Sequence, residues 1–185
     1  YDCAEFGKNA LSFDGVNDRV SIPDNASTNI TGNAVTLEAW IYPTTWRGGS
    51  FEGSIINKEP TGNGGYVLRC GANGSLSFNV GNSAGWLEII SSTNALTLNT
   101  WQHVAGVFDG TSMKFYRDGV QLTPATSLGS FLPIGTSAGI PLQIGEWSQS
   151  DARGFIGKID EARVWNVALG QSTIVSGMNQ LYCGD

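Results

Sequence analysis

The chain has 185 residues, a formal net charge of −6 and only 14% charged residues. This length suits one domain, and we expect a single domain over residues 1–185. The acidic balance and the lack of a Lys/Arg cluster exclude nucleic acid and anionic membrane surfaces as partners, because both require a basic patch. No apolar run approaches the roughly 18 residues of a membrane span, so we expect no membrane insertion.

Short β-prone runs follow one another along the whole chain, each bounded by Gly, Asn, Asp or Pro. They are residues 10–13, 19–22, 35–42, 54–57, 65–70, 75–80, 86–91, 101–108, 113–117, 120–122, 142–145 and 155–165. The one candidate helix is 169–178, near the C-terminus, and Gly170 weakens it. Strands without βαβ alternation predict an all-β fold, a two-sheet antiparallel β-sandwich with at most one short helix.

Residues 101–122 form the clearest local unit. Asp109-Gly110 and Asp118-Gly119 separate three β-prone runs, and an Asp-Gly pair is a strong hairpin signal because glycine accepts a positive φ. Both faces of 101–108 are largely apolar, so this strand is expected in the middle of a layered structure rather than at a solvated edge.

The three cysteines are Cys3, Cys70 and Cys183, and their spacing matches no zinc motif. Domain termini often meet in space, so we predict a Cys3–Cys183 disulfide and hence an oxidising compartment. Three unpaired thiols remain the alternative. Cys70 is expected to be a small buried apolar residue.

Six motifs, taken together and in order, resemble the laminin G-like, concanavalin A-like lectin/glucanase jelly-roll domains. They are ALSFDGVNDRVSIPD, VTLEAWIYP, TWQHVAGVFDG, MKFYRDGV, PLQIG and GFIGKIDEARVWNVAL. The resemblance implies two curved antiparallel sheets, frequently a structural calcium, and a role in sugar or protein binding. It does not identify the ligand, because sandwiches host many functions.

The sequence gives little support for an enzyme. Glycoside hydrolysis needs two carboxylates that flank one bond, and the E-x-D-x-x-E strand pattern of laminarinase-type relatives is absent. Asp160 and Glu161 are neighbours, which point to opposite faces of a strand. His103, the sole histidine, is expected as a buried, hydrogen-bonded residue inside the sandwich rather than as a general base.

Calcium is the cofactor that the resemblance implies, in a structural role. Related domains hold it with an Asp of the final strand and carbonyls from the start of the chain. Transferred to this sequence, the ligands are Asp160, Asp14 and the carbonyl of Gly32. Alternatively, Asp14 builds a turn and Asp160 pairs with an arginine.

Sugar rings stack on aromatic faces, and planar polar side chains bind their hydroxyls. Tryptophans 40, 101 and 165 lie in strand motifs and are expected in the core, whereas the other three lie at strand ends or in loops, where binding groups usually sit. The candidate ligand-binding residues are therefore Trp46, Arg47, Trp86, Glu146, Trp147 and Arg153. Each loop tryptophan could instead cover the rim of the sandwich.

The preferred hypothesis is a non-catalytic carbohydrate-binding module of a larger secreted or cell-surface protein, with a polysaccharide or glycan as partner. The alternative is a calcium-dependent protein-binding or adhesion module whose partner is an extracellular protein. A third hypothesis is a glycoside hydrolase or polysaccharide lyase whose catalytic residues come from separate strands.

Overall fold

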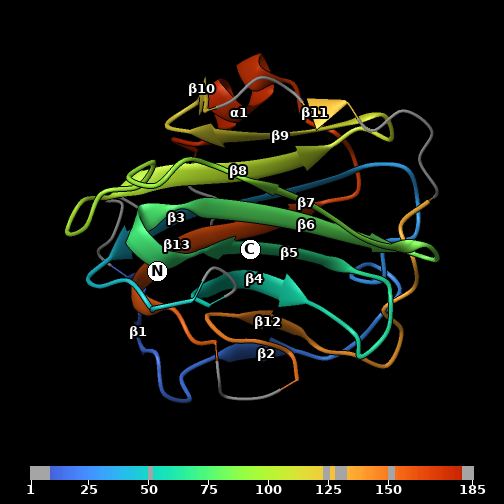
Figure 1. Cartoon of the computed structure of the whole chain (residues 1–185), viewed down its shortest axis with the longest axis horizontal. Coiled ribbons are helices and arrows are strands. Elements are labelled where there is room, and N and C mark those ends of the chain that lie inside the picture. The colour runs from blue at the N-terminus through green and yellow to red at the C-terminus, as the bar shows by residue number, and fades with distance from the viewer. Residues whose placement is uncertain (1–8, 50–51, 123–125, 128–132, 150–152, 181–185) are drawn as a thin grey trace.

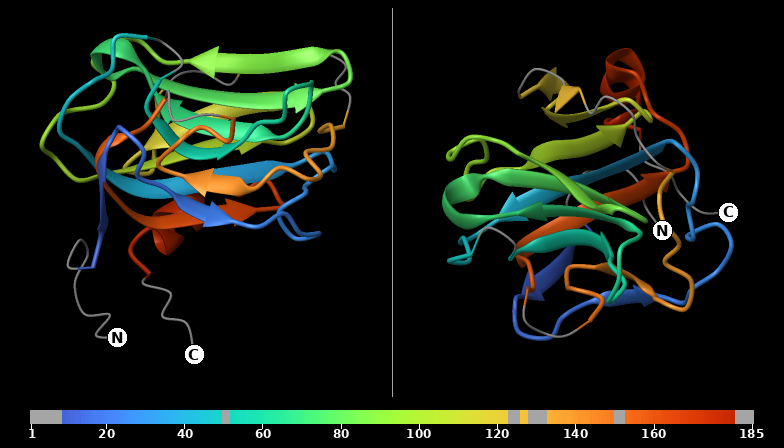
Figure 2. Two further views of the ribbon diagram at one scale, coloured as in Figure 1. Left: turned by 90° about the horizontal axis from the view of Figure 1, so that it is seen from below. Right: turned by 45° about the vertical axis from the view of Figure 1, so that its right-hand side comes forward.

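The computed structural model describes residues 9–49, 52–122, 126–127, 133–149 and 153–180, which form two antiparallel sheets stacked face to face (Figure 1; Figure 2, left). The seven-stranded sheet has the order β1-β13-β3-β8-β9-β10, and β11 also pairs with β9. Its strands are β1 (Leu11–Asp14), β3 (Val35–Pro43), β8 (Gln102–Phe108), β9 (Ser112–Arg117), β10 (Val120–Gln121), β11 (Thr126–Ser127) and β13 (Ile156–Trp165).

The six-stranded sheet has the order β2-β12-β4-β5-β6-β7 and lies nearer the viewer in Figure 1. Its strands are β2 (Val20–Ile22), β4 (Ser54–Lys58), β5 (Tyr66–Cys70), β6 (Leu76–Asn82), β7 (Gly85–Ile90) and β12 (Leu142–Ile144). A 3-10 helix, η1 (Ala72–Gly74), joins β5 to β6, and the helix α1 (Gln171–Gly177) follows β13. The predicted two-sheet antiparallel sandwich with one short helix near the C-terminus is confirmed.

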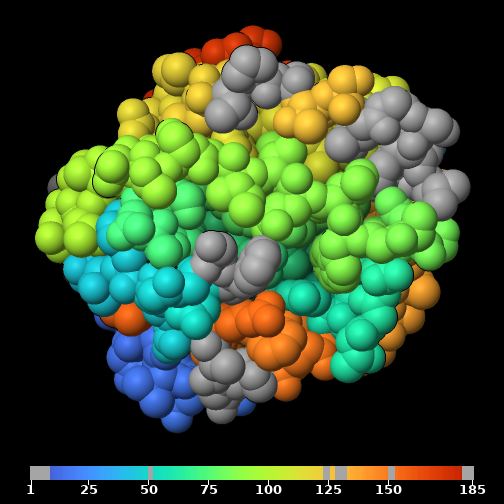
Figure 3. All heavy atoms as spheres, in the orientation of Figure 1, coloured from blue at the N-terminus to red at the C-terminus, as the bar shows by residue number. Residues whose placement is uncertain are grey.

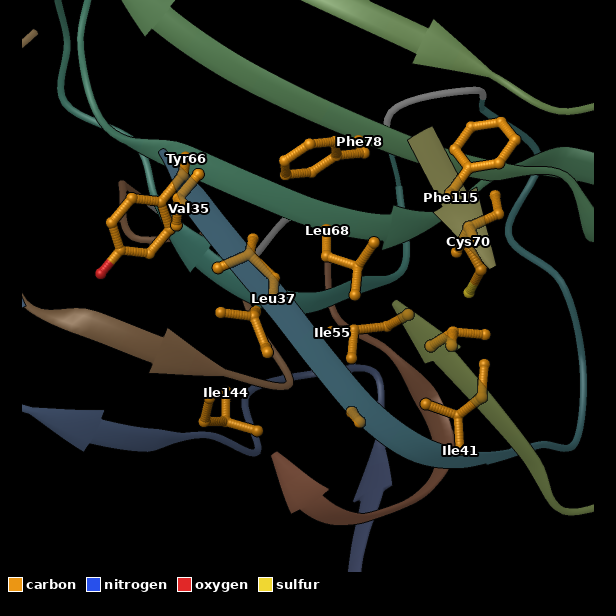
Figure 4. Packing of buried hydrophobic residues seen from close by; sticks show 14 of the residues in the cluster. Val35, Leu37, Ile41, Ile55, Tyr66, Leu68, Cys70, Phe78, Phe115 and Ile144 are labelled. Carbon is orange, nitrogen blue, oxygen red and sulfur yellow. The ribbon is translucent and has the colours of Figure 1, made fainter. Parts of the chain in front are cut away.

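The core lies between the two sheets. Alternate residues of a strand point to opposite faces, so Val35, Leu37 and Ile41 of β3 all point inward and are fully buried. Figure 4 shows them against Leu68 and Phe78 of the six-stranded sheet. Interdigitation of two inner faces in this way is typical of a β-sandwich.

The β8–β9–β10 unit is the predicted meander. Gly110 and Gly119 adopt φ values of 86° and 74°, the left-handed region that tight turns require. The Asp109 carboxylate completes the first turn by accepting bonds from the backbone N–H groups of Thr111 (3.0 Å) and Ser112 (2.7 Å). The Asp-Gly signals therefore marked both turns correctly.

A second, smaller apolar cluster lies on the outer face of the seven-stranded sheet, where α1 packs. Ile174 of α1 is fully buried against Ala105, Val107 and Tyr116. This layer explains why β8 is apolar on both faces, and it confirms that the strand is internal. Figure 2 (left) shows the helix on the side of this sheet opposite to the six-stranded sheet.

The expectation that Trp40, Trp101 and Trp165 belong to the core is wrong. All three are half-buried and point away from the core. Trp40 Nε1 donates to the carbonyl of Met178 at 2.7 Å, and the Trp101 ring lies 5.6 Å from that of Tyr42. They support the segment that follows α1 and the rim of the seven-stranded sheet.

The first and last described strands are neighbours, since β1 pairs with β13 and Leu11 lies opposite Ile159. Cys3 and Cys183 lie outside the described residues, so the predicted disulfide stays a prediction. Cys70 is buried in the core as expected, and burial raises the pKa of its thiol to about 12.

Candidate functional site

The outer face of the six-stranded sheet carries a line of polar side chains across β5, β6 and β7. Each strand points its apolar residues into the core, so the alternate positions face outward. The register places Arg69 opposite Ser77, Asn79 opposite Glu88, and Trp86 opposite Gly81. Side chains that are far apart in the sequence therefore meet on one surface. Figure 3 views the molecule from the side of this sheet.

Arg69 is the centre of this surface. Its Nη2 donates to Asn79 Oδ1 at 3.1 Å and to Glu88 Oε1 at 3.3 Å, while Nη1 lies 3.8 Å from Glu59 Oε2. Burial lowers the pKa of the guanidinium, and the two glutamates oppose that shift. Arg69 stays charged, because arginine does not deprotonate in proteins, and it is held in one orientation by three partners.

The loop between β12 and β13 forms the facing wall. The guanidinium of Arg153 lies 3.9 Å from the centroid of the Trp147 ring, a cation–π contact, and its Nη1 lies 3.8 Å from Glu59 Oε2. Ser148 Oγ and Gln149 Nε2 both donate to the carbonyl of Glu59, each at 2.6 Å. This segment is thereby fixed to the end of β4.

Between these walls lies a pocket of about 310 Å³. Trp86 supplies an aromatic ring, and the polar groups are two guanidiniums, two carboxylates and an amide. Its lining residues are Glu59, Val67, Arg69, Asn79, Trp86, Glu88 and Arg153. An aromatic surface beside convergent planar hydrogen-bonding groups is the arrangement expected of a small polar ligand site.

Of the six predicted ligand-binding residues, Trp86 and Arg153 line this pocket, and Trp147 borders it through its stack with Arg153. Glu146 is fully buried, and its Oε1 accepts from the backbone N–H groups of Trp147 (2.7 Å) and Arg153 (2.9 Å). Arg47 donates to the carbonyls of Gly154 (2.9 Å) and Gly15. Glu146 and Arg47 therefore hold the loop in place and do not line the pocket.

Trp46 lies elsewhere. It packs against the core, and its ring is so near Gly74 that a Cβ there would lie 3.0 Å from Cζ2. Gly74 precedes β6, whereas Trp86 pairs with Gly81 at the other end of that strand. At about 3.3 Å per residue, the backbone positions beside the two tryptophans, Gly74 and Gly81, are roughly 20 Å apart. The three loop tryptophans do not form one platform.

The structure does not bring the three candidate calcium ligands together. Asp14 lies opposite Ile156 in the β1–β13 ladder, and Asp160 is four residues further along β13, about 13 Å away. Oxygens that share one calcium lie within about 5 Å of each other. The Gly32 carbonyl accepts from the N–H of Ile134 at 3.0 Å, near the Trp165 end of β13. The structure therefore does not group these three residues around one point, and calcium binding stays a prediction from the resemblance.

Asp14 and Asp160 are engaged locally instead. Asp14 Oδ1 accepts from the N–H of Val16 at 2.8 Å, which is the turn-building role named as its alternative. Asp160 Oδ1 accepts from the N–H of Glu161 at 2.9 Å. Among the residues that the structure describes, no group of three His, Cys, Asp or Glu side chains could hold a metal.

His103 lies on the opposite side of the molecule from the pocket, on the outer face of the seven-stranded sheet. It is buried, and its Nε2 lies 3.5 Å from Glu38 Oε2. Glu38 Oε1 accepts from Trp165 Nε1 at 2.9 Å and lies 3.4 Å from Arg163 Nη1. Burial by itself raises the pKa of Glu38, but the nearby His103 and the hydrogen bond from Trp165 outweigh it and hold that pKa below the ordinary value.

Sequence reasoning missed Glu59, Arg69, Asn79 and Glu88. Arg69 and Glu88 carry a visible signal, because each interrupts an otherwise apolar strand at an outward position. Asn79 does not, because its strand alternates and Ser77 lies on the same face. The register that aligns them is not visible in the sequence. Glu59 follows β4 and has no comparable signal.

Solved structures with the same fold include a protein described as carbohydrate-binding, a domain solved with an oligosaccharide, and a pentraxin. A Bacteroides ovatus protein described as carbohydrate-binding is 21% identical with a TM-score of 0.67, covering 90% of this chain and 45% of that one. Domain 4 of an extracellular GH43 arabinanase from Geobacillus stearothermophilus, solved with arabinotriose, is also 21% identical with a TM-score of 0.67, covering 93% and 78%. A SAP-like pentraxin from Limulus polyphemus is 18% identical with a TM-score of 0.63, covering 91% and 80%.

This chain therefore spans less than half of the Bacteroides ovatus protein. A search of curated proteins finds no match. Among the described residues, no helix is long and apolar enough to cross a membrane.

A family model for laminin G-type domains, described as the concanavalin A-like lectin/glucanases superfamily, matches residues 14–175. That match covers most of the 185 residues. The chain belongs to the concanavalin A-like lectin/glucanase superfamily.

Proposed function

We propose that this domain is a non-catalytic carbohydrate-binding module of a secreted or cell-surface protein, and that it binds a glycan in the 310 Å³ pocket. The observation that carries the proposal is the composition of the pocket, in which Trp86 lies beside fixed planar donors and acceptors. A sugar ring presents C–H groups to an aromatic face and hydroxyls at its edge, and this arrangement can satisfy both. The descriptions of two structural neighbours, a carbohydrate-binding protein and an arabinanase domain solved with arabinotriose, are consistent with it.

The position of Arg69 supports a binding role rather than hydrolysis. Glu59 and Glu88 both line the pocket, but the guanidinium lies between them and pairs with each. A glycosidase needs room for a glycosidic bond, and in inverting enzymes also a water, between its two carboxylates. Arg69 fills that space, so these carboxylates are arranged to accept bonds from hydroxyl groups.

Trp86→Ala is the direct test, measured on a glycan array and then by affinity electrophoresis in gels that contain the polysaccharides retained on the array. Trp101→Ala is the matched control, because it truncates another half-buried tryptophan on the other sheet. Loss of a central aromatic contact weakens binding by about 30-fold or more, corresponding to at least 2 kcal/mol. The control variant should retain the wild-type affinity.

Three results would count against the proposal. Equal binding by wild type and Trp86→Ala would place the site elsewhere. Binding to no glycan would remove the carbohydrate role and favour protein binding. New reducing ends or unsaturated products on incubation with a retained polysaccharide would contradict the non-catalytic assignment.

A further inference from the structure

A second hollow lies at the rim of the sandwich, between residues 26–32 and residues 164–166. Its volume is about 480 Å³, and it shares no lining residue with the first pocket. The residues that matter for its chemistry are Ser27, Asn29, Thr31, Gly32, Trp165 and Asn166. We call this hollow the rim cleft.

The lining of the rim cleft is polar without being ionic. Among the described residues, none that lines it is charged, in contrast to the two Arg and two Glu of the first pocket. Ser27 and Thr31 offer hydroxyls, Asn29 and Asn166 offer amides, and Trp165 offers an aromatic ring. A carboxylate or phosphate buried here would find no cation among these residues, which is costly, whereas an uncharged polyol can pair with hydroxyl and amide groups.

One wall is fixed by hydrogen bonds to β5 and to the segment that precedes β12. Asn29 Oδ1 accepts from the N–H of Ser137 at 3.0 Å, and the Tyr66 hydroxyl donates to the carbonyl of Thr28 at 2.7 Å. Ile30, which follows Thr28 and Asn29, is buried in the core. The 26–32 loop is therefore anchored before any ligand arrives.

The other wall is equally constrained. The indole N–H of Trp165 donates to the buried Glu38 carboxylate at 2.9 Å, so the ring cannot turn without breaking that bond. A site whose walls are already ordered loses little conformational entropy on binding. Both walls of the rim cleft meet that condition.

We propose that the rim cleft is a second, separate binding site for an uncharged sugar unit. The inference rests on the proposed function for the class of ligand, but it does not rest on the first pocket. Two sites on one domain allow it to engage two points of a single polysaccharide, which raises the avidity above that of either site.

The test follows the indole N–H signals of Trp86 and Trp165 by ¹⁵N NMR. Uncharged trisaccharides of arabinose, xylose, glucose, mannose and galactose are titrated into the wild type and into Trp86→Ala, with trigalacturonate as the charged comparator. Gly32→Leu adds a bulky side chain to the lining of the rim cleft, and a Cβ at Gly32 meets no atom within 4 Å, so no clash with the fold is expected. Gly48→Leu is the matched control, since its Cβ is equally unhindered and Gly48 lines neither site.

The expected result is that an uncharged trisaccharide moves the Trp165 signal in Trp86→Ala, and that Gly32→Leu weakens this binding by about tenfold or more while Gly48→Leu does not. A shift confined to Trp86 would overturn the second site and leave the proposed function standing. A shift confined to Trp165 would support the rim cleft and overturn the first pocket. No shift at either signal would overturn both, and equal binding of trigalacturonate at Trp165 would overturn the preference for uncharged sugars.

Discussion

Replacing Arg69 by Met tests whether its guanidinium organises the pocket. Met keeps an unbranched apolar side chain in place of the buried stem and removes only the charged group. The Arg69 side chain is 5% exposed, and its contacts with Glu88 and Glu59 measure 3.3 and 3.8 Å. The substitution therefore leaves two carboxylates without their shared partner.

The expected cost follows from these distances and from the exposure of the carboxylates. At an effective dielectric constant of about 20, the two pairs correspond to gross attractions of roughly 5 and 4 kcal/mol, most of which the burial of the guanidinium offsets. Removing one partner of a fully buried pair costs about 3–5 kcal/mol. Because the side chains of Glu59 and Glu88 remain 18% and 23% exposed, water can solvate the carboxylates that lose Arg69. We therefore expect Arg69→Met to lower the free energy of unfolding by about 2–3 kcal/mol. In a chain of this length, Tm then falls by about 4–12 °C.

Thermal unfolding followed by circular dichroism measures the stability, and affinity electrophoresis measures glycan retention. Arg69→Lys keeps the charge but not the fork geometry, so it should recover part of the stability and little of the binding. Arg117→Met is the control: that side chain is 37% exposed, pairs with Asp118 at 3.7 Å and donates to the carbonyl of Ala95, so its removal should lower the free energy of unfolding by less than that of Arg69. If Arg69→Met and Arg117→Met have the same small effect on Tm, and glycan retention is unchanged, the assignment of Arg69 is refuted.

Two further predictions concern the framework around the site. Gly106→Ala should lower the free energy of unfolding, measured by urea titration, by about 1–3 kcal/mol, because its Cβ would lie 2.6 Å from Cγ and Cδ2 of Phe78. Adding Phe78→Leu to the same chain should relieve part of that loss. Strictly additive effects of the two substitutions would show that the residues do not compete for space. Acid should destabilise the fold, because the pKa of Glu38 is lower in the folded state than in the unfolded chain. The stability that Glu38 contributes is fully present above the ordinary pKa of a glutamate and is lost as pH falls through the lower, folded pKa. Glu38→Gln should be less stable than the wild type at neutral pH and lose less on acidification, and parallel Tm curves for the two proteins between about pH 6 and 3 would contradict this.

The fold could be predicted from the sequence because its signals are local. The Asp-Gly turns at Gly110 and Gly119 and the alternation of Val35, Leu37 and Ile41 each depend on a few adjacent residues. The resemblance to jelly-roll domains then implied two curved antiparallel sheets, whereas the order of the strands within them came only from the structure. Even the apolar outer face of β8, which pointed to a covering layer, was a property of one run of eight residues.

The site could be predicted only in part because it depends on register and on loop packing. Trp86 and Arg153 were selected for their position in loops or at strand ends, but the same criterion also selected Trp46, which packs against Gly74. Arg69 was passed over because a single arginine within a strand is uninformative until its neighbours across the sheet are known. Asp14 and Asp160 lie in paired strands, yet four residues of offset separate them.

The mutual pairing of the pocket's ionic groups has a consequence for how binding should depend on salt concentration. Its two arginines and two glutamates pair among themselves at 3.3–3.8 Å, so their charges cancel when viewed from a distance. The paired groups of the pocket then exert little long-range electrostatic attraction on an approaching ligand. Dissolved salt screens electrostatic interactions beyond about 8–10 Å, so it should have little effect on binding in this pocket. If the proposed function holds, glycan retention should therefore change little between low and high salt concentration, whereas retention through an unpaired cation would weaken as salt rises.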